Sequence, residues 1–334
     1  MTSAGLLGPA PAPTDPIRIG FQVWSMGISW PDLMAAGERV EAMGFSSLFA
    51  NDHFLPVFGD AAGPVVGEPG PVFEGWMVLA GFAARTRRVP LGMMVSAVGY
   101  RNIGLTVKMV TALDHASDGR LMLGIGAGWH EPEIEAFGYE QLTLGGRLGR
   151  LDEAAAVART LLDGEAATHD GQFIRAKGMR NDPPPLQERL PLLIAGSGEK
   201  RTLRIVARDA DIWNGEGVPE VYAHKNTVLD RWCAELGRDP RAIRRTVGVP
   251  PVCIRDTRDG AVEALAAILG RYGGPPGRAR AWAASSPLAD TEEAVAAHLR
   301  GWRAAGAEEA IVDQPWPLDD ETFERLASLP SALA

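Results

Sequence analysis

Eight short apolar segments recur along the chain, and segments with helical periodicity separate most of them. The apolar segments span residues 17–23, 46–50, 89–96, 120–126, 190–195, 210–213, 246–254 and 309–312. Strands that alternate with helices form right-handed βαβ units around a parallel sheet. Several of the segments are apolar throughout, as in strands covered on both faces. The pattern predicts an α/β protein, and eight units in about 300 residues favour a (β/α)8 TIM barrel over a doubly wound sheet, which usually has fewer strands.

The helical segments and the irregular stretches set the expected domain boundaries. The clearest helical patterns cover residues 31–43, 72–85, 103–116, 147–162 and 291–305. Residues 1–16 lack a basic segment followed by an apolar one, so we expect a flexible tail rather than a signal peptide. We expect a single barrel domain over residues 17–330. Residues 163–189 do not fit one βα unit, because they hold a turn at 169–173 and three consecutive prolines, and they predict an insertion between units four and five.

Charge and cysteine content exclude several classes of function. The net charge of −9 argues against nucleic acid as the main partner. No apolar run approaches the ~18–20 residues that span a bilayer, so no membrane partner is expected. Cys233 and Cys253 are too few for a disulfide framework, and a cytoplasmic location is therefore expected.

Gly196-Ser197-Gly198 follows the fifth apolar segment and precedes a helical pattern that begins at Lys200. In this order, the free N–H groups and the positive dipole end of a helix attract phosphate. Glycine permits close approach of a ligand, and the Ser197 hydroxyl adds a donor. Lys200 and Arg201 are placed to reach acidic groups beyond the phosphate. An ordinary βα turn explains the same residues, so both interpretations stay open.

In a barrel, catalytic residues lie where the strands end at the C-terminal face. The unusual residues at these ends are Trp24, Asp52, His53, Ser96, Gly126, Ala127, Gly128, Trp129, Trp213 and Asn214. His53 suits a general acid or base, and Asp52 suits a contact to cofactor or substrate. Side chains alternate along a strand, so Asp52 need not orient His53. The structural alternative is that Asp52 caps the next segment and His53 fills polar space at the rim.

The run from Gly124 to Gly128 is a weak dinucleotide signal, because its last two glycines are separated by one residue rather than two. A tight turn that lets a flat ring approach the barrel mouth fits better. Trp129 would then be an apolar wall, or a rim residue packed on the next helix.

Other catalytic classes lack their motifs. No metal site is expected, because the six histidines do not have zinc-helix spacing and there is no Cys-x-x-Cys motif. Serine hydrolase chemistry lacks its Gly-x-Ser-x-Gly turn. The acidic series Glu131, Glu133 and Glu135 is expected to form a solvated face.

Five of these segments, in this order, resemble the bacterial luciferase-like family and most closely its branch that uses the deazaflavin coenzyme F420. The segments are residues 47–54, 98–102, 119–129, 194–203 and 210–214. The resemblance is strong over residues 17–215 and extends to the last third of the chain only by pattern.

The resemblance implies a barrel with a flavin or deazaflavin at its C-terminal face and the cofactor phosphate near Gly196–Gly198. It implies a non-prolyl cis peptide behind the ring, at Met94-Val95 or Val95-Ser96. In the sugar-phosphate dehydrogenase relatives an Asp-His-Phe segment like the one at Asp52 contacts the ring, with the histidine, here His53, in the catalytic role. The family also makes a homodimer the expected assembly.

Two departures from the family pattern narrow the expected chemistry. Trp129 stands where those dehydrogenases carry glutamate, which argues against sugar-phosphate oxidation. Ala127 stands where FMN-using relatives often carry arginine, which favours F420 over FMN. We therefore expect hydride transfer between F420 and a small organic substrate, with reduction of a C=C or C=N bond favoured, in a pocket that includes Trp24, Trp213 and Asn214. The alternatives are an FMN-dependent monooxygenase and a barrel that binds cofactor without turnover.

Overall fold

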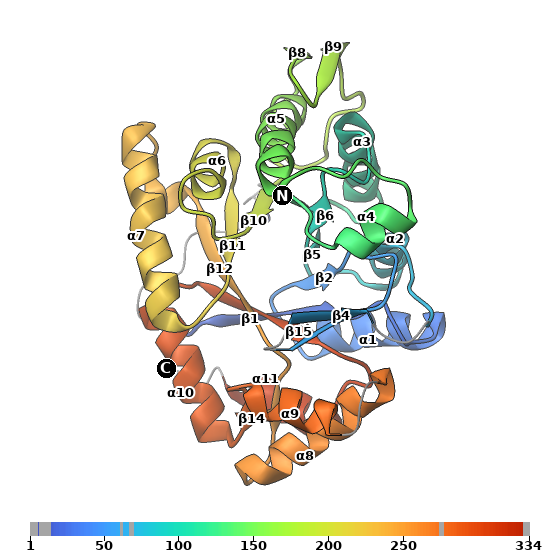
Figure 1. Ribbon diagram of the computed structural model, residues 1–334, viewed down its shortest axis with the longest axis vertical. Coiled ribbons are helices and arrows are strands. Elements are labelled where there is room, and N and C mark those ends of the chain that lie inside the picture. Colours follow the sequence, from blue (N-terminus) through green and yellow to red (C-terminus); the bar gives the residue numbers. More distant parts are fainter. Residues whose placement is uncertain (1–5, 7–14, 61–62, 67–69, 274–276, 330–334) are drawn as a thin grey trace.

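Eight parallel strands close into a barrel in the computed structural model, which describes residues 6, 15–60, 63–66, 70–273 and 277–329 (Figure 1). In barrel order the strands are β1 (Arg18–Val23), β2 (Leu48–Ala50), β5 (Leu91–Met93), β7 (Leu121–Gly126), β10 (Leu192–Ala195), β11 (Ile212–Gly215), β12 (Arg244–Val249) and β15 (Glu309–Gln314). A short strand, β6 (Ser96–Ala97), also pairs with β7. Pairing of β1 with β15 closes the ring between segments far apart in the chain.

Helices surround the barrel on its outer side (Figure 1). The helices of the described residues are α1 (Trp30–Ala42), α2 (Gly75–Arg85), α3 (Ile103–Ala116), α4 (Glu131–Ala136), α5 (Leu144–Leu162), α6 (Thr202–Asp209), α7 (Pro219–Glu235), α8 (Arg258–Leu269), α9 (Arg278–Ser285), α10 (Glu292–Ala304) and α11 (Asp320–Ser328). Side chains cap several N-termini; Asn102, for example, accepts hydrogen bonds from the N–H groups of Gly104 and Leu105.

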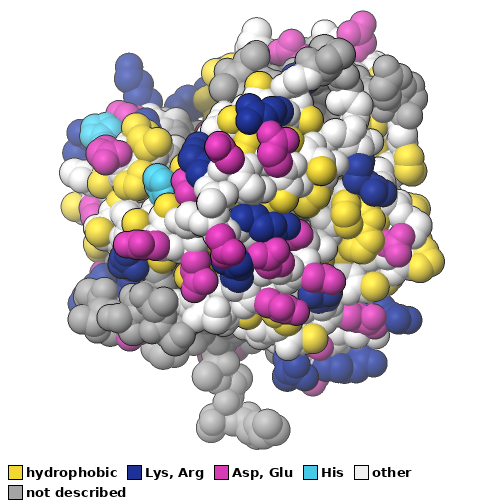
Figure 2. Space-filling model, turned by 90° about the horizontal axis from the view of Figure 1, so that it is seen from below, with side chains coloured by type: hydrophobic (Ala, Val, Ile, Leu, Met, Phe, Trp, Pro, Cys, Tyr) yellow, Lys and Arg dark blue, Asp and Glu magenta, His cyan; other side chains and the backbone are white. Residues whose placement is uncertain are grey.

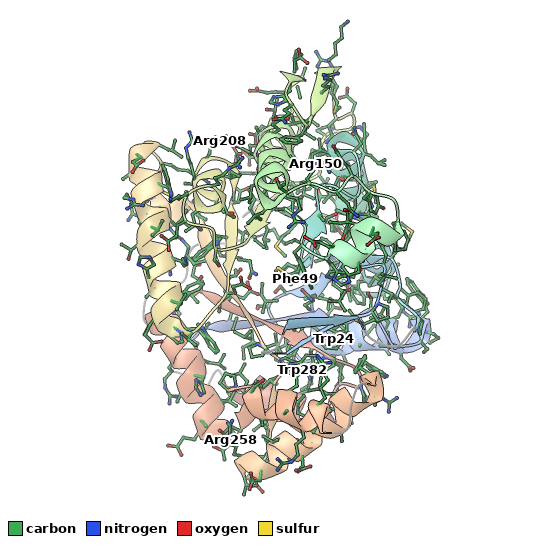
Figure 3. The ribbon with its side chains drawn as sticks, in the orientation of Figure 1. Trp24, Phe49, Arg150, Arg208, Arg258 and Trp282 are labelled. Atoms are coloured by element: carbon green, nitrogen blue, oxygen red, sulfur yellow. The ribbon has the colours of Figure 1, made fainter. Side chains whose placement is uncertain are left out.

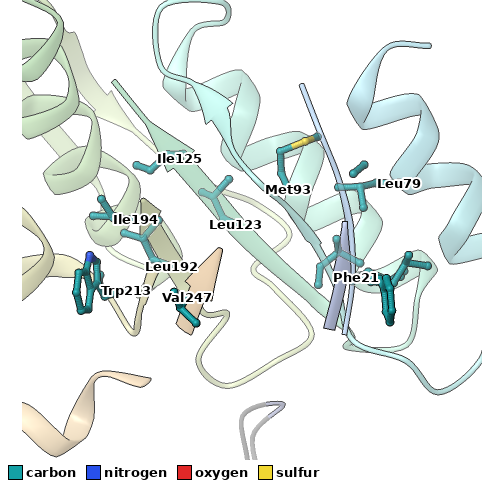
Figure 4. Close-up of a cluster of buried hydrophobic side chains, with 14 of the residues drawn as sticks. Phe21, Leu79, Met93, Leu123, Ile125, Leu192, Ile194, Trp213 and Val247 are labelled. Atoms are coloured by element: carbon teal, nitrogen blue, oxygen red, sulfur yellow. The ribbon is translucent and has the colours of Figure 1, made fainter. Parts of the chain in front are cut away.

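The (β/α)8 TIM barrel predicted from the sequence is confirmed, and each of the eight apolar segments overlaps one barrel strand. Residues of neighbouring strands fill the core, as Figure 4 shows for Leu123, Ile125, Leu192 and Ile194 on β7 and β10. All four are at most 1% exposed. Burial on both faces explains why these strands read as apolar runs without alternation.

The predicted insertion between units four and five contains an antiparallel hairpin, β8 (Ala167–Asp170) and β9 (Arg175–Met179). It projects at one end of the molecule, beyond α5 (Figure 1). Glu153 of α5 holds the hairpin turn, since its carboxylate accepts hydrogen bonds from the backbone N–H groups of residues 172–174. Between β2 and α2, β3 (Val57–Asp60) pairs with β4 (Gly63–Val66) in an antiparallel hairpin.

A second added segment lies between β12 and β15 and was not predicted. It comprises β13 (Cys253–Ile254), α8, the 3-10 turn Gly270–Tyr272, α9 and β14 (Ala289–Asp290), and β13 pairs with β14. Trp24 joins this segment to the barrel, with its ring 5.8 Å from that of Trp282 (Figure 3). Two-residue strands carry too little periodicity to be recognised in the sequence.

The face seen in Figure 2 carries acidic and basic side chains interspersed, without one dominant patch of either sign. Among the described residues no helix has the length and apolar character needed to cross a bilayer. The expected tail over residues 1–16 lies mostly outside the described residues.

Candidate active site at the barrel mouth

A cavity of about 340 Å³ opens at the C-terminal ends of the strands. Ten of the predicted site residues line it: Asp52, His53, Met94, Val95, Gly126, Ala127, Gly128, Trp129, Gly196 and Asn214. Tyr100, Thr202 and Glu216 also contribute to the wall. The peptide bond between Met94 and Val95 is cis, at one of the two positions that the resemblance implies. The cavity therefore brings together the ends of β2, β5, β7, β10 and β11.

Asp52 belongs to a buried ion-pair network beneath this cavity. Its carboxylate accepts hydrogen bonds from Arg101 Nη1 at 2.6 Å, Arg101 Nη2 at 3.0 Å and Ser96 Oγ at 2.6 Å. Arg101 also pairs with Glu74, the N-cap residue of α2. Ser96 lies in this network rather than in the cavity wall. The network ties the second and third barrel units together, with the charge of Asp52 paired to Arg101.

His53 is held by a different carboxylate, that of Glu133. His53 Nδ1 lies 3.0 Å from Glu133 Oε2, and the Tyr100 hydroxyl donates to the same oxygen at 2.8 Å. Glu133 Oε1 accepts from the backbone N–H groups of Phe54 at 2.7 Å and Leu55 at 2.9 Å. An ionised carboxylate is an acceptor only, so Nδ1 of His53 carries the proton in this arrangement. His53 Nε2 makes no hydrogen bond to the described residues and remains available to a ligand.

The environment of Glu133 keeps it ionised. Burial acts to raise its pKa, but the hydrogen bond and charge of His53, together with donation from Leu55 and Tyr100, lower the pKa to about 2. The pKa of Tyr100 is raised by burial and by Glu133, so its hydroxyl remains a donor. His130, buried beside His53 with ring centroids 5.9 Å apart, has its pKa lowered by burial. Burial thus favours the neutral form of the neighbouring His130 imidazole.

The prediction of a solvated face for Glu131, Glu133 and Glu135 is wrong for Glu133, whose side chain is 0% exposed. Residues two apart on a helix point to opposite sides, whereas Glu131 and Glu135, four apart, share one side. That spacing was the signal in the sequence that distinguishes Glu133 from its neighbours. Arg101 and Tyr100 lie in one of the five matching segments but were not assigned a role.

The glycine turn at residues 196–198 is supported from behind by Trp213. The side chain of Trp213 is 0% exposed, stacks on Tyr222 and donates from Nε1 to the carbonyl oxygen of Gly196 at 2.9 Å. The structure therefore places Trp213 behind the turn and not in the cavity wall. Ser197 Oγ is buried and has no hydrogen-bond partner among the described residues. Gly196 has φ +116°, which disfavours any residue with a side chain.

The basic residues after this turn lie outside the cavity wall. Lys200 and Arg201 are exposed. Arg201 Nη1 donates to the carbonyl oxygen of Gly145 in α5 at 2.8 Å, and Arg201 is the N-cap residue of α6 without a side-chain cap. Gly198 likewise lies outside this wall.

A second cavity of about 290 Å³ adjoins the first and shares Met94, Asn214 and Glu216 with it. Asp313, at the end of β15, lies in its wall. Trp24 Nε1 and Gln22 Nε2 both donate to Asp313 Oδ1, at 2.5 Å and 2.9 Å. Burial raises the pKa of Asp313 to about 6, and Trp24, His53 and Gln22 lower it only in part. Trp24 is thus placed behind Asp313 rather than in either cavity wall.

Within the described part of the chain, no group of three or more His, Cys, Asp or Glu side chains has an arrangement that could hold a metal ion.

Known proteins share this sequence pattern and fold. The family model of luciferase-like monooxygenases matches residues 14–326. An F420-dependent glucose-6-phosphate dehydrogenase of Microbacterium testaceum is 30% identical over 67% of this chain and 65% of its own length. An uncharacterized protein of Mycobacterium tuberculosis is 29% identical over 54% of this chain and 65% of its own length. The chain thus spans about two thirds of the length of these curated relatives. The relative named as an F420-dependent dehydrogenase supports the expectation that this chain is an enzyme.

Two solved structures show the likeness in fold. An F420-dependent secondary alcohol dehydrogenase, in complex with an F420-acetone adduct, superposes with a TM-score of 0.78 at 18% identity and covers 96% of this chain and 99% of its own. The oxygenating constituent of 3,6-diketocamphane monooxygenase of Pseudomonas putida, in complex with FMN, has a TM-score of 0.72 at 14% identity and covers 94% and 97%. At these identities the likeness concerns the fold alone.

Proposed function

The chain belongs to the luciferase-like monooxygenase family. Within this family, we propose that it is an F420-dependent oxidoreductase. It transfers a hydride between the deazaflavin and a small organic substrate, and reduction of a C=C or C=N bond is the favoured reaction. Support comes from a relative named as an F420-dependent dehydrogenase and from another, in Mycobacterium kansasii, named as a ketoreductase, 27% identical over 91% of this chain and 83% of its own length.

The residues at the barrel mouth fit a flat ring that carries a phosphate. Met94, Val95 and the turn from Gly126 to Gly128 offer a mostly backbone and apolar surface for the ring. Ser197 Oγ, a buried donor without a partner, and the N-terminus of α6 suit the phosphate. When bound there, the deazaflavin would supply or accept the hydride.

The observation that carries the proposal is the pairing of His53 with Glu133 in the cavity wall. Glu133 holds the proton on Nδ1 and leaves Nε2 as the atom that takes or gives the proton accompanying hydride transfer. The ionised carboxylate also stabilises the imidazolium that forms when Nε2 gains a proton. Trp129, whose ring centroid lies 5.7 Å from that of His53, limits access of water to this atom.

Cofactor titration tests the proposal. F420 should bind at least about tenfold more tightly than FMN, a difference of about 1.4 kcal/mol, as measured by the fluorescence of each cofactor. Tighter binding of FMN would favour the second candidate, an FMN-dependent monooxygenase, which the family name and the FMN-bound neighbour support.

Substitution of His53 then tests for catalysis. His53→Gln should lower turnover of a reducible substrate by about a hundredfold or more, with F420 affinity unchanged. Unchanged turnover would remove His53 from the mechanism. Binding of F420 without turnover of any substrate by the native chain would favour a cofactor-binding barrel.

A further inference from the structure

The cavity around Asp313 differs in charge from the rest of the barrel mouth. The described residues of its wall include two carboxylates, Asp313 and Glu216, and no Lys, Arg or His side chain. No ion pair links either carboxylate to a cation among the described residues. The cavity adjoins the proposed ring position through Met94 and Asn214, which line both cavities. It is therefore the space that a substrate beside the ring would enter.

The hydrogen bonds of Asp313 leave half of its carboxylate unused. Both donors, Trp24 Nε1 and Gln22 Nε2, bind Oδ1, and Oδ2 accepts no hydrogen bond from the described residues. Gln22 and Asp313 are register partners on β1 and β15, so the backbone pairing fixes this geometry. A desolvated carboxylate without a cation is unfavourable, and a ligand that brings a positive charge removes the imbalance.

The other carboxylates at the barrel mouth do not have this property. Asp52 is paired with Arg101 at 2.6 Å, and Glu133 has donors on both oxygens. The charges of Asp52 and Glu133 are therefore balanced by groups of the protein itself. Asp313 differs from these two because one of its oxygens accepts no hydrogen bond from the described residues, and Glu216, exposed and in the same cavity wall, adds a second negative charge.

We propose that Asp313 is a specificity-determining residue that binds the protonated nitrogen of a cationic substrate, an iminium or ammonium compound. The inference rests on the proposed function, since it places the substrate beside the cofactor ring. It narrows the favoured reaction from C=C or C=N bonds to substrates in which a nitrogen carries positive charge. A charge-assisted hydrogen bond from that nitrogen to Oδ2 would both neutralise Asp313 and orient the substrate.

Three five-membered ring probes of similar size separate charge from shape. Pyrrolidine is a cation at pH 8, cyclopentanol is a neutral donor, and tetrahydrofuran is a neutral acceptor. Ligand-observed NMR titration measures their affinities for the full chain, with and without F420, and for Asp313→Asn. Asp170→Asn serves as the matched control, because the Asp170 side chain is 95% exposed on the β8–β9 hairpin. F420 affinity is measured for every variant.

The native chain and Asp170→Asn should bind pyrrolidinium at least about tenfold more tightly than either neutral probe. Asp313→Asn should remove this preference while its affinity for the neutral probes and for F420 stays within about twofold. Equal affinities for the three probes in the native chain would overturn the inference, whatever the variant does. A preference for cyclopentanol would assign Asp313 to neutral donors and also overturn it. Failure of F420 to bind, with the cation preference intact, would count against the proposed function alone.

Discussion

Glu133 and Asp313 are two desolvated carboxylates at the mouth of one barrel, and their surroundings are opposite. Glu133 has donors on both oxygens, and its pKa is lowered to about 2. Asp313 has two donors on one oxygen, no ion pair with any described residue, and a pKa that burial raises to about 6. Burial acts to raise the pKa of both groups; the donors and the charge around Glu133 outweigh it, whereas those around Asp313 do not.

Removing the charge of Glu133 is expected to have the largest effect. Glu133→Gln should lower turnover by roughly a hundredfold, because Nδ1 of His53 loses its fixed proton and the imidazolium its counter-charge. The pH profile of turnover, recorded with F420 in excess, should change its shape. F420 affinity should stay within about twofold.

Glu131→Gln is the matched control for this variant. Its carboxylate is on the same helix, is 77% exposed and lies 3.4 Å from Arg147. It should leave both turnover and the pH profile unchanged. If Glu133→Gln lowers turnover without moving the pH profile, Glu133 has only a structural role and the contrast with Asp313 weakens.

Removing the charge of Asp313 is expected to have the next largest effect, an increase in the free energy of unfolding. The folded-state pKa of about 6 lies above the unfolded value of about 3.9, so the folded chain binds the proton more tightly. Native stability therefore falls as pH rises from about 4 to 6, by about 2–3 kcal/mol. Asp313→Asn should recover about this amount at pH 8, and the gain should vanish below pH 4. Denaturant unfolding at several pH values measures it.

The expected gain in the free energy of unfolding distinguishes a carboxylate that is unsatisfied in the folded chain from one that stabilises it. Asp170→Asn should show no pH-dependent gain, since the side chain is in solvent. A loss of stability in Asp313→Asn at pH 8 would mean that Asp313 is satisfied in the folded chain, as Glu133 is.

The smallest effect is expected at Ser197, where the same rule applies to a neutral group. Its hydroxyl is buried without a partner, so it should gain a hydrogen bond when a phosphate binds. Ser197→Ala should weaken F420 binding about five- to tenfold, or about 1–1.5 kcal/mol, and slightly stabilise the chain without cofactor. Fluorescence titration measures the affinity, and Ser285→Ala, on exposed α9, is the control. Equal affinities in both variants would separate the glycine turn from the phosphate.

The barrel was predictable because its eight buried strands are continuous apolar runs, which can be recognised in the sequence without knowing which residues are in contact. The position of His53 followed from the rule that chemistry lies at strand ends. The same rule reaches Asp313 once the eighth strand is extended to its real end at Gln314, two residues beyond the apolar run. Glu133 was harder to find, because its helix has only six residues and periodicity is weak at that length.

Aromatic residues were the least predictable part of the site. Trp24 and Trp129 follow barrel strands and Trp213 lies within β11, but of the three only Trp129 lines the cavity. Trp213 supports a carbonyl oxygen and Trp24 supports a carboxylate, each through its indole N–H. The sequence indicates only that a tryptophan is a large side chain with one hydrogen-bond donor. The side of a turn on which it lies depends on how distant segments pack against it.

Because β1 and β15 come from opposite ends of the chain, the barrel cannot close until synthesis is nearly complete. Gln22 and Asp313 are bonded partners separated by 291 positions. At ribosomal speeds of about 5–20 residues per second, roughly 15–60 s pass between the emergence of the two. Throughout that interval the nascent chain presents an apolar strand edge without its final neighbour, which is the kind of surface that chaperones bind and that invites pairing between chains.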